Sequence, residues 1–334
     1  MSIHYGISPI YPIIDQTGNR NRLYVMREDL LPFGLGGNKV RIANEFFEDM
    51  KAKGCDTMVA YGNVRSNLCR VIANQCCKEK IPCYIICSME ADDEVKETSN
   101  SQLMKLLDAN LVFCEKNKIA ETVEQLMEQL KNEGRNPYYI YGNKYGTGNE
   151  GTAARAYAKV AELICSYERE QGCSFDYVFH ASGTGATQSG LTCGMLVQNR
   201  DVKVMGVLIS SRDYQRAWSI IKDGMESWFT DQKIKWEESY ASSIHLLDAY
   251  KKGGYGMYDE EIVTCIQQAF ANNSLPLDPV YTGKAYWGMM QYIMEQGIKG
   301  KTILFIHTGG SPLFYDALQD GILNANPIAS DIFN

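Results

Sequence analysis

Short apolar runs alternate with longer segments of helical spacing along almost the whole chain. Ala43, Phe46, Phe47 and Met50, for example, recur at the three- and four-residue intervals of one helix face. The apolar runs predict strands at 22–27, 57–61, 82–87, 111–114, 138–141, 177–180, 202–209 and 302–307. The periodic segments predict helices at 42–53, 66–78, 100–108, 120–132, 152–167, 187–198, 214–229, 260–272 and 283–295.

Strands and helices of these lengths, in alternation, indicate parallel sheets joined by right-handed crossovers. The glycine-rich stretch 142–151 is the best candidate for a crossing between two domains. We therefore expect an α/β fold with two open, twisted, mostly parallel sheets and flanking helices. Residues 43–145 would form a small α/β domain, and 1–42 together with 146–334 would form a larger one.

Composition and charge narrow the class of function. Of 334 residues, 45% are hydrophobic and 22% are charged, and the net charge of −7 argues against a nucleic-acid partner. No window approaches the length of a membrane span. The eleven cysteines are odd in number and lack a CxxC pair, so we expect them to be reduced, in a cytoplasmic protein. Four histidines without ligand spacing make a metal site improbable.

The segment PFGLGGNKVR at 32–41 carries the strongest chemical signal. Its glycines permit positive φ and close backbone approach, and they place Lys39 in the first turn of a helix. Helix amides and burial both lower the pKa of a lysine there, so that some neutral amine can attack a carbonyl and form a Schiff base. A solvated lysine is the simpler alternative. A phosphate-binding Walker loop fits worse, because Asn38 and Val40 replace its glycine and hydroxyl residues.

A second glycine-rich turn, ASGTGATQSG at 181–190, joins a predicted strand directly to a predicted helix. Ser182, Thr184 and Thr187 supply hydroxyls, and Gly183 and Gly185 let successive amides converge on an anion at the helix start. The pattern favours a phosphate site over a merely flexible turn. It contains no lysine, which suits a single phosphate better than a triphosphate.

Two further strand-to-helix steps point to the same cleft. YGNVRSNLCR at 61–70 places Ser66 and Asn67 near a helix start, where both are also ordinary N-cap residues. HTGG at 307–310 follows the last strand. In open α/β sheets, ligands collect beyond the carboxyl ends of the strands. Gly146, Gly148 and Gly151 match the GxGxxG of nucleotide-binding oxidoreductases, but this run opens no new βαβ unit at a domain start.

Taken together, these motifs resemble the fold type II (tryptophan synthase β-like) pyridoxal-phosphate enzymes, in particular the family of D-cysteine desulfhydrase and 1-aminocyclopropane-1-carboxylate deaminase. The resemblance runs from REDL at Arg27 to HTGG at Gly310. It implies pyridoxal 5′-phosphate as cofactor, with Lys39 as the internal aldimine and Asn38 beside it. It also implies that Asn67 holds the pyridoxal 3-hydroxyl and that Ser66 contacts the substrate carboxylate or assists proton transfer. The phosphate loop would be Thr184, Gly185, Ala186 and Thr187.

The resemblance places two tyrosines at the substrate, Tyr255 in GGYGM and Tyr281 in LDPVYTGKA. A phenol there can move a proton, although a packed aromatic is the simpler alternative. The deaminase branch has a glutamate beside the ring nitrogen, where this chain has Thr282; Thr308 would be the ring-nitrogen partner instead. A hydroxyl leaves that nitrogen largely neutral, which still supports loss of a good leaving group.

We therefore expect α,β-elimination on a small amino acid, most simply D-cysteine giving pyruvate, ammonia and sulfide. The alternatives are 1-aminocyclopropane-1-carboxylate deamination, elimination from another β-substituted amino acid, cofactor binding without turnover, or a nucleotide-binding oxidoreductase. Leu68 and Arg65 depart from the family pattern, and an Arg65 facing the cleft would favour an acidic substrate. The resemblance also implies a homodimer.

Overall fold

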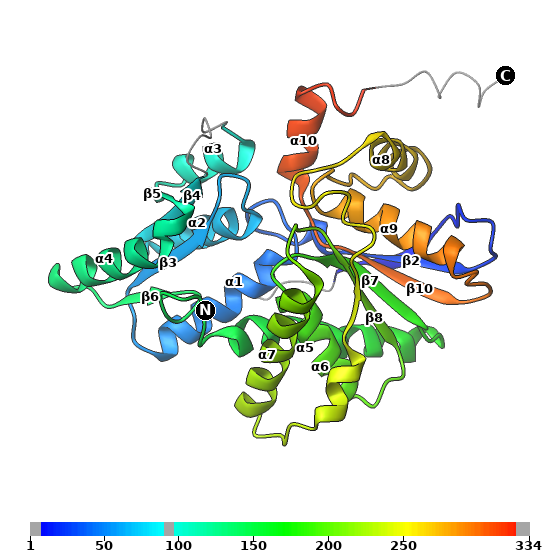
Figure 1. Cartoon of the computed structure of the whole chain (residues 1–334), viewed down its shortest axis with the longest axis horizontal. Helices are drawn as coiled ribbons and strands as arrows, with labels where there is room; N and C mark the ends of the chain where they lie inside the picture. Colours follow the sequence, from blue (N-terminus) through cyan, green and yellow to red (C-terminus); the bar gives the residue numbers. More distant parts are fainter. Residues whose placement is uncertain (1–7, 90–96, 325–334) are drawn as a thin grey trace.

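The computed structural model describes residues 8–89 and 97–324, which form two lobes, each built on its own sheet (Figure 1). The smaller sheet is parallel throughout and has the order β5-β4-β3-β6. Its strands are β3 (Thr57–Gly62), β4 (Cys83–Met89), β5 (Asn110–Glu115) and β6 (Pro137–Tyr139).

The larger sheet has the order β1-β2-β10-β7-β8-β9, and only the edge pair β1–β2 is antiparallel. Its strands are β1 (Ile10–Ile13), β2 (Arg22–Arg27), β7 (Tyr177–Ser182), β8 (Lys203–Leu208), β9 (His245–Leu247) and β10 (Thr302–His307). The central strands β7 and β10 are almost wholly buried, as expected for a parallel sheet covered on both faces. The predicted α/β fold with two mostly parallel sheets is thus confirmed.

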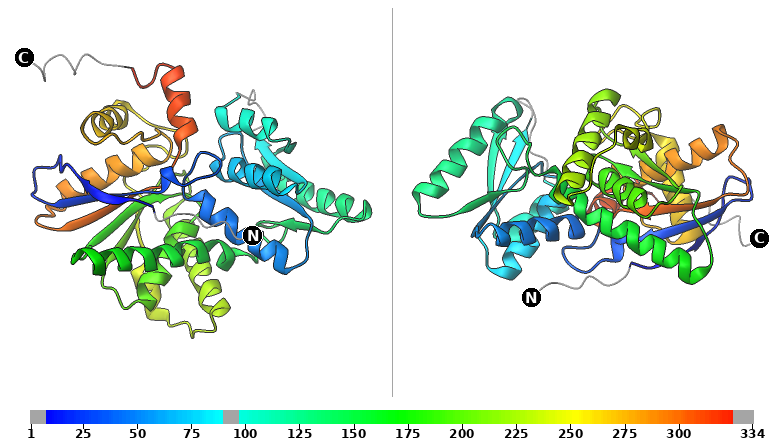
Figure 2. Two further views of the ribbon diagram at one scale, coloured as in Figure 1. Left: turned by 180° about the vertical axis from the view of Figure 1, so that it is seen from behind. Right: turned by 90° about the horizontal axis from the view of Figure 1, so that it is seen from below.

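Helices flank both sheets and carry the crossovers (Figure 2). They are α1 (Lys39–Ala52), α2 (Asn67–Glu79), α3 (Ser99–Leu106), α4 (Ile119–Asn132), α5 (Glu150–Gln171), α6 (Ala186–Val197), α7 (Tyr214–Asp231), α8 (Glu260–Asn273), α9 (Thr282–Glu295) and α10 (Ser311–Gln319). Short 3₁₀ turns lie at Glu28–Leu30, Lys116–Lys118 and Glu238–Ser243. The sequence pattern did not predict β1, β9 or α10, which are four, three and nine residues long.

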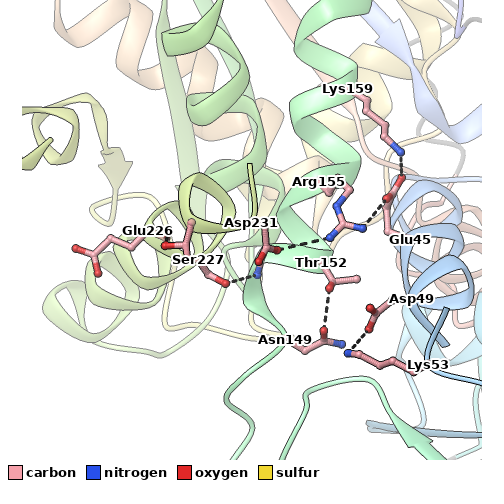
Figure 3. A network of polar contacts seen from close by, with 12 residues as sticks. Glu45, Asp49, Lys53, Asn149, Thr152, Arg155, Lys159, Glu226, Ser227 and Asp231 are labelled. Atoms are coloured by element: carbon pink, nitrogen blue, oxygen red, sulfur yellow. Dashed lines mark hydrogen bonds and ion pairs between the residues drawn. The ribbon is translucent and has the colours of Figure 1, made fainter. Parts of the chain in front are cut away.

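Helix α1 connects the two lobes, because it packs against α2 of the small lobe and α5 of the large one. A polar network fixes it to the large lobe (Figure 3). The buried Glu45 of α1 accepts from Lys159 Nζ at 2.5 Å, and its carboxylate lies 3.8 Å from Arg155 Nη1. The other terminal nitrogen of Arg155, Nη2, lies 3.5 Å from Asp231 of α7. Because α1 packs against helices of both lobes, the structure does not test the expected domain boundary between residues 42 and 43, which stays a prediction.

Contacts of the buried residue Glu28 hold the turn before α1 in place. The carboxylate of Glu28 is fully buried and accepts from Arg41, Tyr157 and Ser8. Its backbone carbonyl accepts from the amide of Gly37 at 2.9 Å. The side-chain donors offset the cost of burying the carboxylate, and the contacts with Arg41 and Gly37 hold the start of α1 in place.

Candidate active site

A cavity of about 370 Å³ lies between the lobes, at the carboxyl ends of β3, β7 and β10. Its wall combines the four segments that the sequence singled out with the two predicted tyrosines. The lining residues include Lys39, Ser66, Asn67, Thr184, Tyr255, Tyr281 and Thr308. A second cavity of about 440 Å³ adjoins it and shares Lys39, Thr184 and Arg212 with it. The predicted segments thus meet in one cleft.

Lys39 is the first residue of α1, as predicted, and its side chain borders both cavities. Its ammonium group makes no hydrogen bond or ion pair with any residue that the structure describes. Burial lowers the pKa of Lys39 from 10.5 to about 8. A lysine with this pKa is partly neutral near physiological pH and can act as a nucleophile.

Backbone contacts between two distant turns position Lys39. The amide of Asn38 donates to the carbonyl of Thr308 at 2.9 Å, and the Asn38 side chain donates to Thr187 Oγ1 at 3.0 Å. A Cβ on Gly309 would lie 2.6 Å from the Cα of Gly37, so only glycine allows this approach. The lysine turn, the HTGG turn and the start of α6 therefore form one unit.

The charges around the 370 Å³ cavity are of one sign. Lys39, Lys116 and Arg212 border it, and over residues 8–89 and 97–324 no Asp or Glu does. Arg212 donates from Nη1 to the carbonyl of Gly183 at 2.8 Å, and burial lowers its pKa. A cavity lined by cations, amides and hydroxyls is suited to an anionic ligand.

The turn at 183–187 provides donors for such an anion. Gly185 has φ of 91° and precedes α6, so the first amides of the helix have no partner within it. Thr184 borders both cavities, and Ala186 borders the adjoining one. The hydroxyl oxygen of Thr187 accepts from Asn38 Nδ2, and its O–H remains to donate to an anion.

Ser66 and Asn67 begin α2 at the opposite wall. Ser66 caps the helix, because its Oγ accepts from the amide of Cys69 at 3.2 Å. The side-chain oxygen of Asn67 accepts from Asn100 Nδ2 at 3.0 Å and from Arg70 Nη2 at 3.3 Å. Its Nδ2 remains for a ligand in the cavity.

Tyr255 and Tyr281 meet at the cavity wall, with their hydroxyl oxygens 2.9 Å apart. Burial raises the pKa of both phenols, well above 10 for Tyr281. Both hydroxyls therefore keep their protons near neutral pH.

The two threonines considered for the ring nitrogen differ in position. Thr308 borders the cavity. Thr282 is fully buried and does not, because its hydroxyl donates to Asp278 Oδ2 at 2.7 Å and accepts from the Asp278 amide at 2.9 Å. Of the two, only Thr308 can meet a ligand there.

Arg65 does not border this cavity. Its side chain lies beside Gly256 and lines a separate cavity of about 190 Å³, which also contains Glu97 and Asp316. Direct pairing of Arg65 with an acidic substrate above Lys39 therefore has no support. Leu68, the other departure, forms an apolar part of the wall.

Sequence reasoning missed Asn63 and Arg212, which border the cavity from the ends of β3 and β8. Each follows a strand at its carboxyl end, the position that identified Ser66 and Thr308. That signal could have found both.

The GxGxxG glycines have other partners. The amide of Gly148 donates to the Glu150 side chain at 2.8 Å, and that of Gly151 donates to Ser227 Oγ at 3.1 Å. A Cβ on Gly151 would lie 2.6 Å from Asp231 Oδ2, so this glycine serves the contact between α5 and α7. These contacts account for the glycines without a nucleotide.

Within the part of the chain that the structure describes, Lys39 is buried without a hydrogen-bond or ion-pair partner, and no Asp or Glu borders the 370 Å³ cavity beside it. Together with the free amides at the start of α6, this arrangement fits a phosphorylated aldehyde. Residues 1–309 match the family model described as pyridoxal-phosphate dependent enzyme. The chain belongs to this family, and it is accordingly an enzyme that uses pyridoxal 5′-phosphate. This membership excludes the nucleotide-binding oxidoreductase.

Several known proteins and one solved structure are similar to this chain over most of its length. A Pyrococcus abyssi protein, provisionally named 1-aminocyclopropane-1-carboxylate deaminase, is 30% identical over 296 residues, covering 87% of this chain and 84% of its own. A D-cysteine desulfhydrase of Yersinia pestis (strain Pestoides F) is 30% identical over 328 residues, which cover 91% of this chain and 96% of the relative. A crystal structure of an ACC deaminase homologue superposes with a TM-score of 0.82 at 25% identity, covering 94% and 93%.

The relatives carry two different names at equal identity, so the names do not decide the substrate. No helix within the described residues has both the length and the apolar character needed to cross a membrane.

Proposed function

We propose that this enzyme eliminates the β-substituent of a small amino acid, most simply by converting D-cysteine and water to pyruvate, ammonia and sulfide. The observation that carries the proposal is the wall of the 370 Å³ cavity, which no Asp or Glu of residues 8–89 and 97–324 borders, and where Thr308 follows the end of β10. A carboxylate beside the ring nitrogen would make the cofactor a stronger electron sink, as the opening of a cyclopropane demands. A hydroxyl suffices for the loss of a thiolate, which is a good leaving group.

Residues from both lobes would hold the cofactor. Lys39 would bond to its aldehyde carbon, and the turn formed by Thr184, Gly185, Ala186 and Thr187 would bind its phosphate, with Asn38 fixing Thr187. Asn67 would donate to the 3-oxygen and Thr308 would face the ring nitrogen. When bound, pyridoxal phosphate supplies the ring that accepts the electron pair of a breaking bond.

Lys39 and Ser66 would act on the α-carbon and the carboxylate of the substrate. The lowered pKa of Lys39, about 8, gives it the neutral amine needed to accept the α-proton. Ser66 caps α2, and Ser66, Asn67 and Leu68 at the start of that helix border the cavity, a place that suits a carboxylate.

The two tyrosines would serve the leaving group. Both phenols stay protonated near neutral pH and share a 2.9 Å contact, so a proton given by one can be replaced through the other. Protonation of the departing sulfur releases hydrogen sulfide instead of a thiolate, which favours departure.

Deamination of 1-aminocyclopropane-1-carboxylate is the second candidate, because relatives bear that name. It requires the same lysine, serine and tyrosines but gives 2-oxobutanoate and no sulfide. The burial of Thr282 beside Asp278 counts against it, because Thr282 does not border the cavity and no carboxylate of the described residues lines the cavity in place of the missing glutamate.

The test follows the visible spectrum of the purified enzyme while sulfide and 2-oxo acid are measured after addition of D-cysteine. A spectral shift with sulfide and pyruvate supports elimination, and Lys39→Ala should abolish both. L-Cysteine and 1-aminocyclopropane-1-carboxylate are the comparison substrates. A shift with 2-oxobutanoate from the cyclopropane, and no sulfide from either cysteine, would replace the proposal by the deaminase.

A further inference from the structure

Arg70 of α2 is a buried cation that has no anionic partner among the described residues. Its side chain is 1% exposed, and no carboxylate in the described part of the chain pairs with it. Over residues 8–89 and 97–324, its Nε and Nη1 have no hydrogen-bond partner. Burial alone lowers its pKa, to about 10, so it remains charged at neutral pH. An uncompensated buried charge opposes folding, and its presence therefore calls for a reason.

The guanidinium contacts Asn67, a residue that borders the cavity. Nη2 donates to Asn67 Oδ1 at 3.3 Å. On its other side, Arg70 approaches the lysine turn, where a Cβ on Gly34 would lie 3.5 Å from Nη1. The cation thus lies between the two segments that carry Lys39 and Asn67.

Asn100 determines which way the Asn67 amide points. Asn100 Nδ2 donates to the carbonyl of Arg65 at 2.9 Å and to Asn67 Oδ1 at 3.0 Å. Because a backbone carbonyl can only accept, the atom of Asn100 that contacts the Arg65 carbonyl and Asn67 must be its nitrogen, Nδ2. The oxygen of Asn67 consequently faces Asn100 and Arg70, and its NH₂ group faces the cavity.

We propose that Arg70 stabilises an anionic oxygen of the bound cofactor through Asn67, and that this oxygen is the 3-oxygen of pyridoxal phosphate. Arg70 withdraws electron density from the amide oxygen, which strengthens the donor character of Asn67 Nδ2 toward the ligand. The ligand in turn supplies the negative charge that Arg70 lacks. Arg70 is thus a positioning residue that acts through Asn67, and the assignment rests on the proposed placement of the cofactor.

The experiment compares Arg70→Met with Arg70→Lys and wild type as holoenzymes. Bound pyridoxal phosphate has a yellow band when the 3-oxygen is anionic and a near-ultraviolet band when that oxygen carries the proton. Loss of the charge in Arg70→Met should shift intensity to the near-ultraviolet band. It should also weaken cofactor retention in equilibrium dialysis by about tenfold, the value of one charge-assisted hydrogen bond acting indirectly. Arg70→Lys keeps the charge and should retain most of the yellow band.

Gln75→Met is the matched control, since Gln75 is also buried on α2 but pairs with Glu79 rather than with Asn67. It should leave the band ratio unchanged. If Arg70→Met binds the cofactor with the band ratio and retention of wild type, the proposal is wrong. If Arg70→Met does not fold, an Arg70→Lys spectrum as altered as that of an Asn67→Ala enzyme would equally contradict it.

Failure of the proposed reaction is a separate outcome. A wild-type enzyme that retains yellow cofactor but releases no sulfide would remove the elimination on cysteine, while the band ratios would still decide the role of Arg70. A wild type that binds no pyridoxal phosphate would overturn both.

Discussion

The hydroxyl oxygens of Tyr255 and Tyr281 lie 2.9 Å apart, and their rings meet edge to face with centroids 5.8 Å apart. Tyr281 is the residue before α9, whereas Tyr255 lies in the loop before α8. Burial raises the pKa of both phenols. The contact therefore joins two protonated groups from separate segments at one point of the cavity wall.

Replacing either tyrosine by phenylalanine should slow turnover without loss of cofactor. We expect kcat of Tyr281→Phe to fall by about 100-fold, the usual contribution of a positioned proton donor, while the yellow band stays. Tyr286→Phe is the control, because the Tyr286 hydroxyl is buried, has no hydrogen-bond partner among the described residues and does not border the cavity. Steady-state sulfide release measures the effect. Unchanged kcat in both Tyr255→Phe and Tyr281→Phe would exclude a proton-transfer role.

The lowered pKa of Lys39 predicts how cofactor capture depends on pH. Only the neutral amine attacks an aldehyde, and its fraction rises about tenfold per pH unit below the pKa and then levels off. The rate at which apoenzyme captures pyridoxal phosphate should therefore rise up to about pH 8 and flatten above it. Stopped-flow absorbance at a series of pH values measures this rate. A rate that climbs on toward the ordinary lysine value of 10.5 would contradict the burial of Lys39.

Alanine substitutions at two glycines with the same φ angle would distinguish the cost of backbone strain from the cost of steric crowding. Gly18 and Gly36 both have φ of 70°, but a Cβ on Gly18 would have no atom within 4 Å, while one on Gly36 would lie 2.0 Å from the carbonyl oxygen of Asp29. Gly18→Ala should cost about 1 kcal/mol of unfolding free energy from backbone strain alone.

Gly36→Ala adds a steric clash that the turn can relieve only by moving its backbone, so we expect a further 1–3 kcal/mol, approximately. Because Lys39 follows three residues later, this variant should also retain less pyridoxal phosphate. Urea denaturation and equilibrium dialysis measure the two effects. Equal losses in the two variants would mean that the approach of Gly36 to Asp29 carries no weight.

The alternation of strands and helices and the gathering of the cleft residues could be predicted from the sequence. Strand runs ending in glycine and hydroxyl residues mark the carboxyl edges of parallel strands, and such edges share one side of a sheet. Ser66, Thr184 and Thr308 followed from that rule, whereas Lys39 followed from a glycine-rich turn at the start of a helix. All four border one cavity.

Side-chain partners could not be predicted in the same way. The oxygen of Thr187 accepts from Asn38, the hydroxyl of Thr282 donates to Asp278, and Arg65 lies beside Gly256 and lines a separate cavity. Each outcome depends on packing between segments, most of them distant in the sequence, which local patterns do not record. The short strand β9 and the edge strand β1, which contains Pro12, carry too little periodicity to be recognised. The homodimer, the cytoplasmic location and the substrate stay predictions.

Lys284, on the first turn of α9, supports the loop that carries Tyr255. Its side chain is fully buried, and Nζ donates to the carbonyls of Lys251 at 2.9 Å and Gly254 at 2.5 Å. Gly254 immediately precedes Tyr255, so this lysine fixes the backbone from which the phenol extends. Burial lowers the pKa of Lys284 to about 8.

Lys284→Met should leave two loop carbonyls without their donor and cost about 1–3 kcal/mol of unfolding free energy. It should also lower kcat by displacing Tyr255, whereas Lys251→Met, which removes a half-exposed cation paired with Asp248, should do neither.

The lowered pKa of Lys284 also predicts in which direction the stability changes with pH. Below about pH 8 the folded and unfolded states both hold the Lys284 proton, and between about 8 and 10.5 the unfolded state holds more. The stability of wild type relative to Lys284→Met should therefore increase as the pH rises through that window, as urea denaturation on either side of it would measure. A stability difference that shrinks with rising pH would mean that Lys284 is not held as a desolvated amine in the folded enzyme.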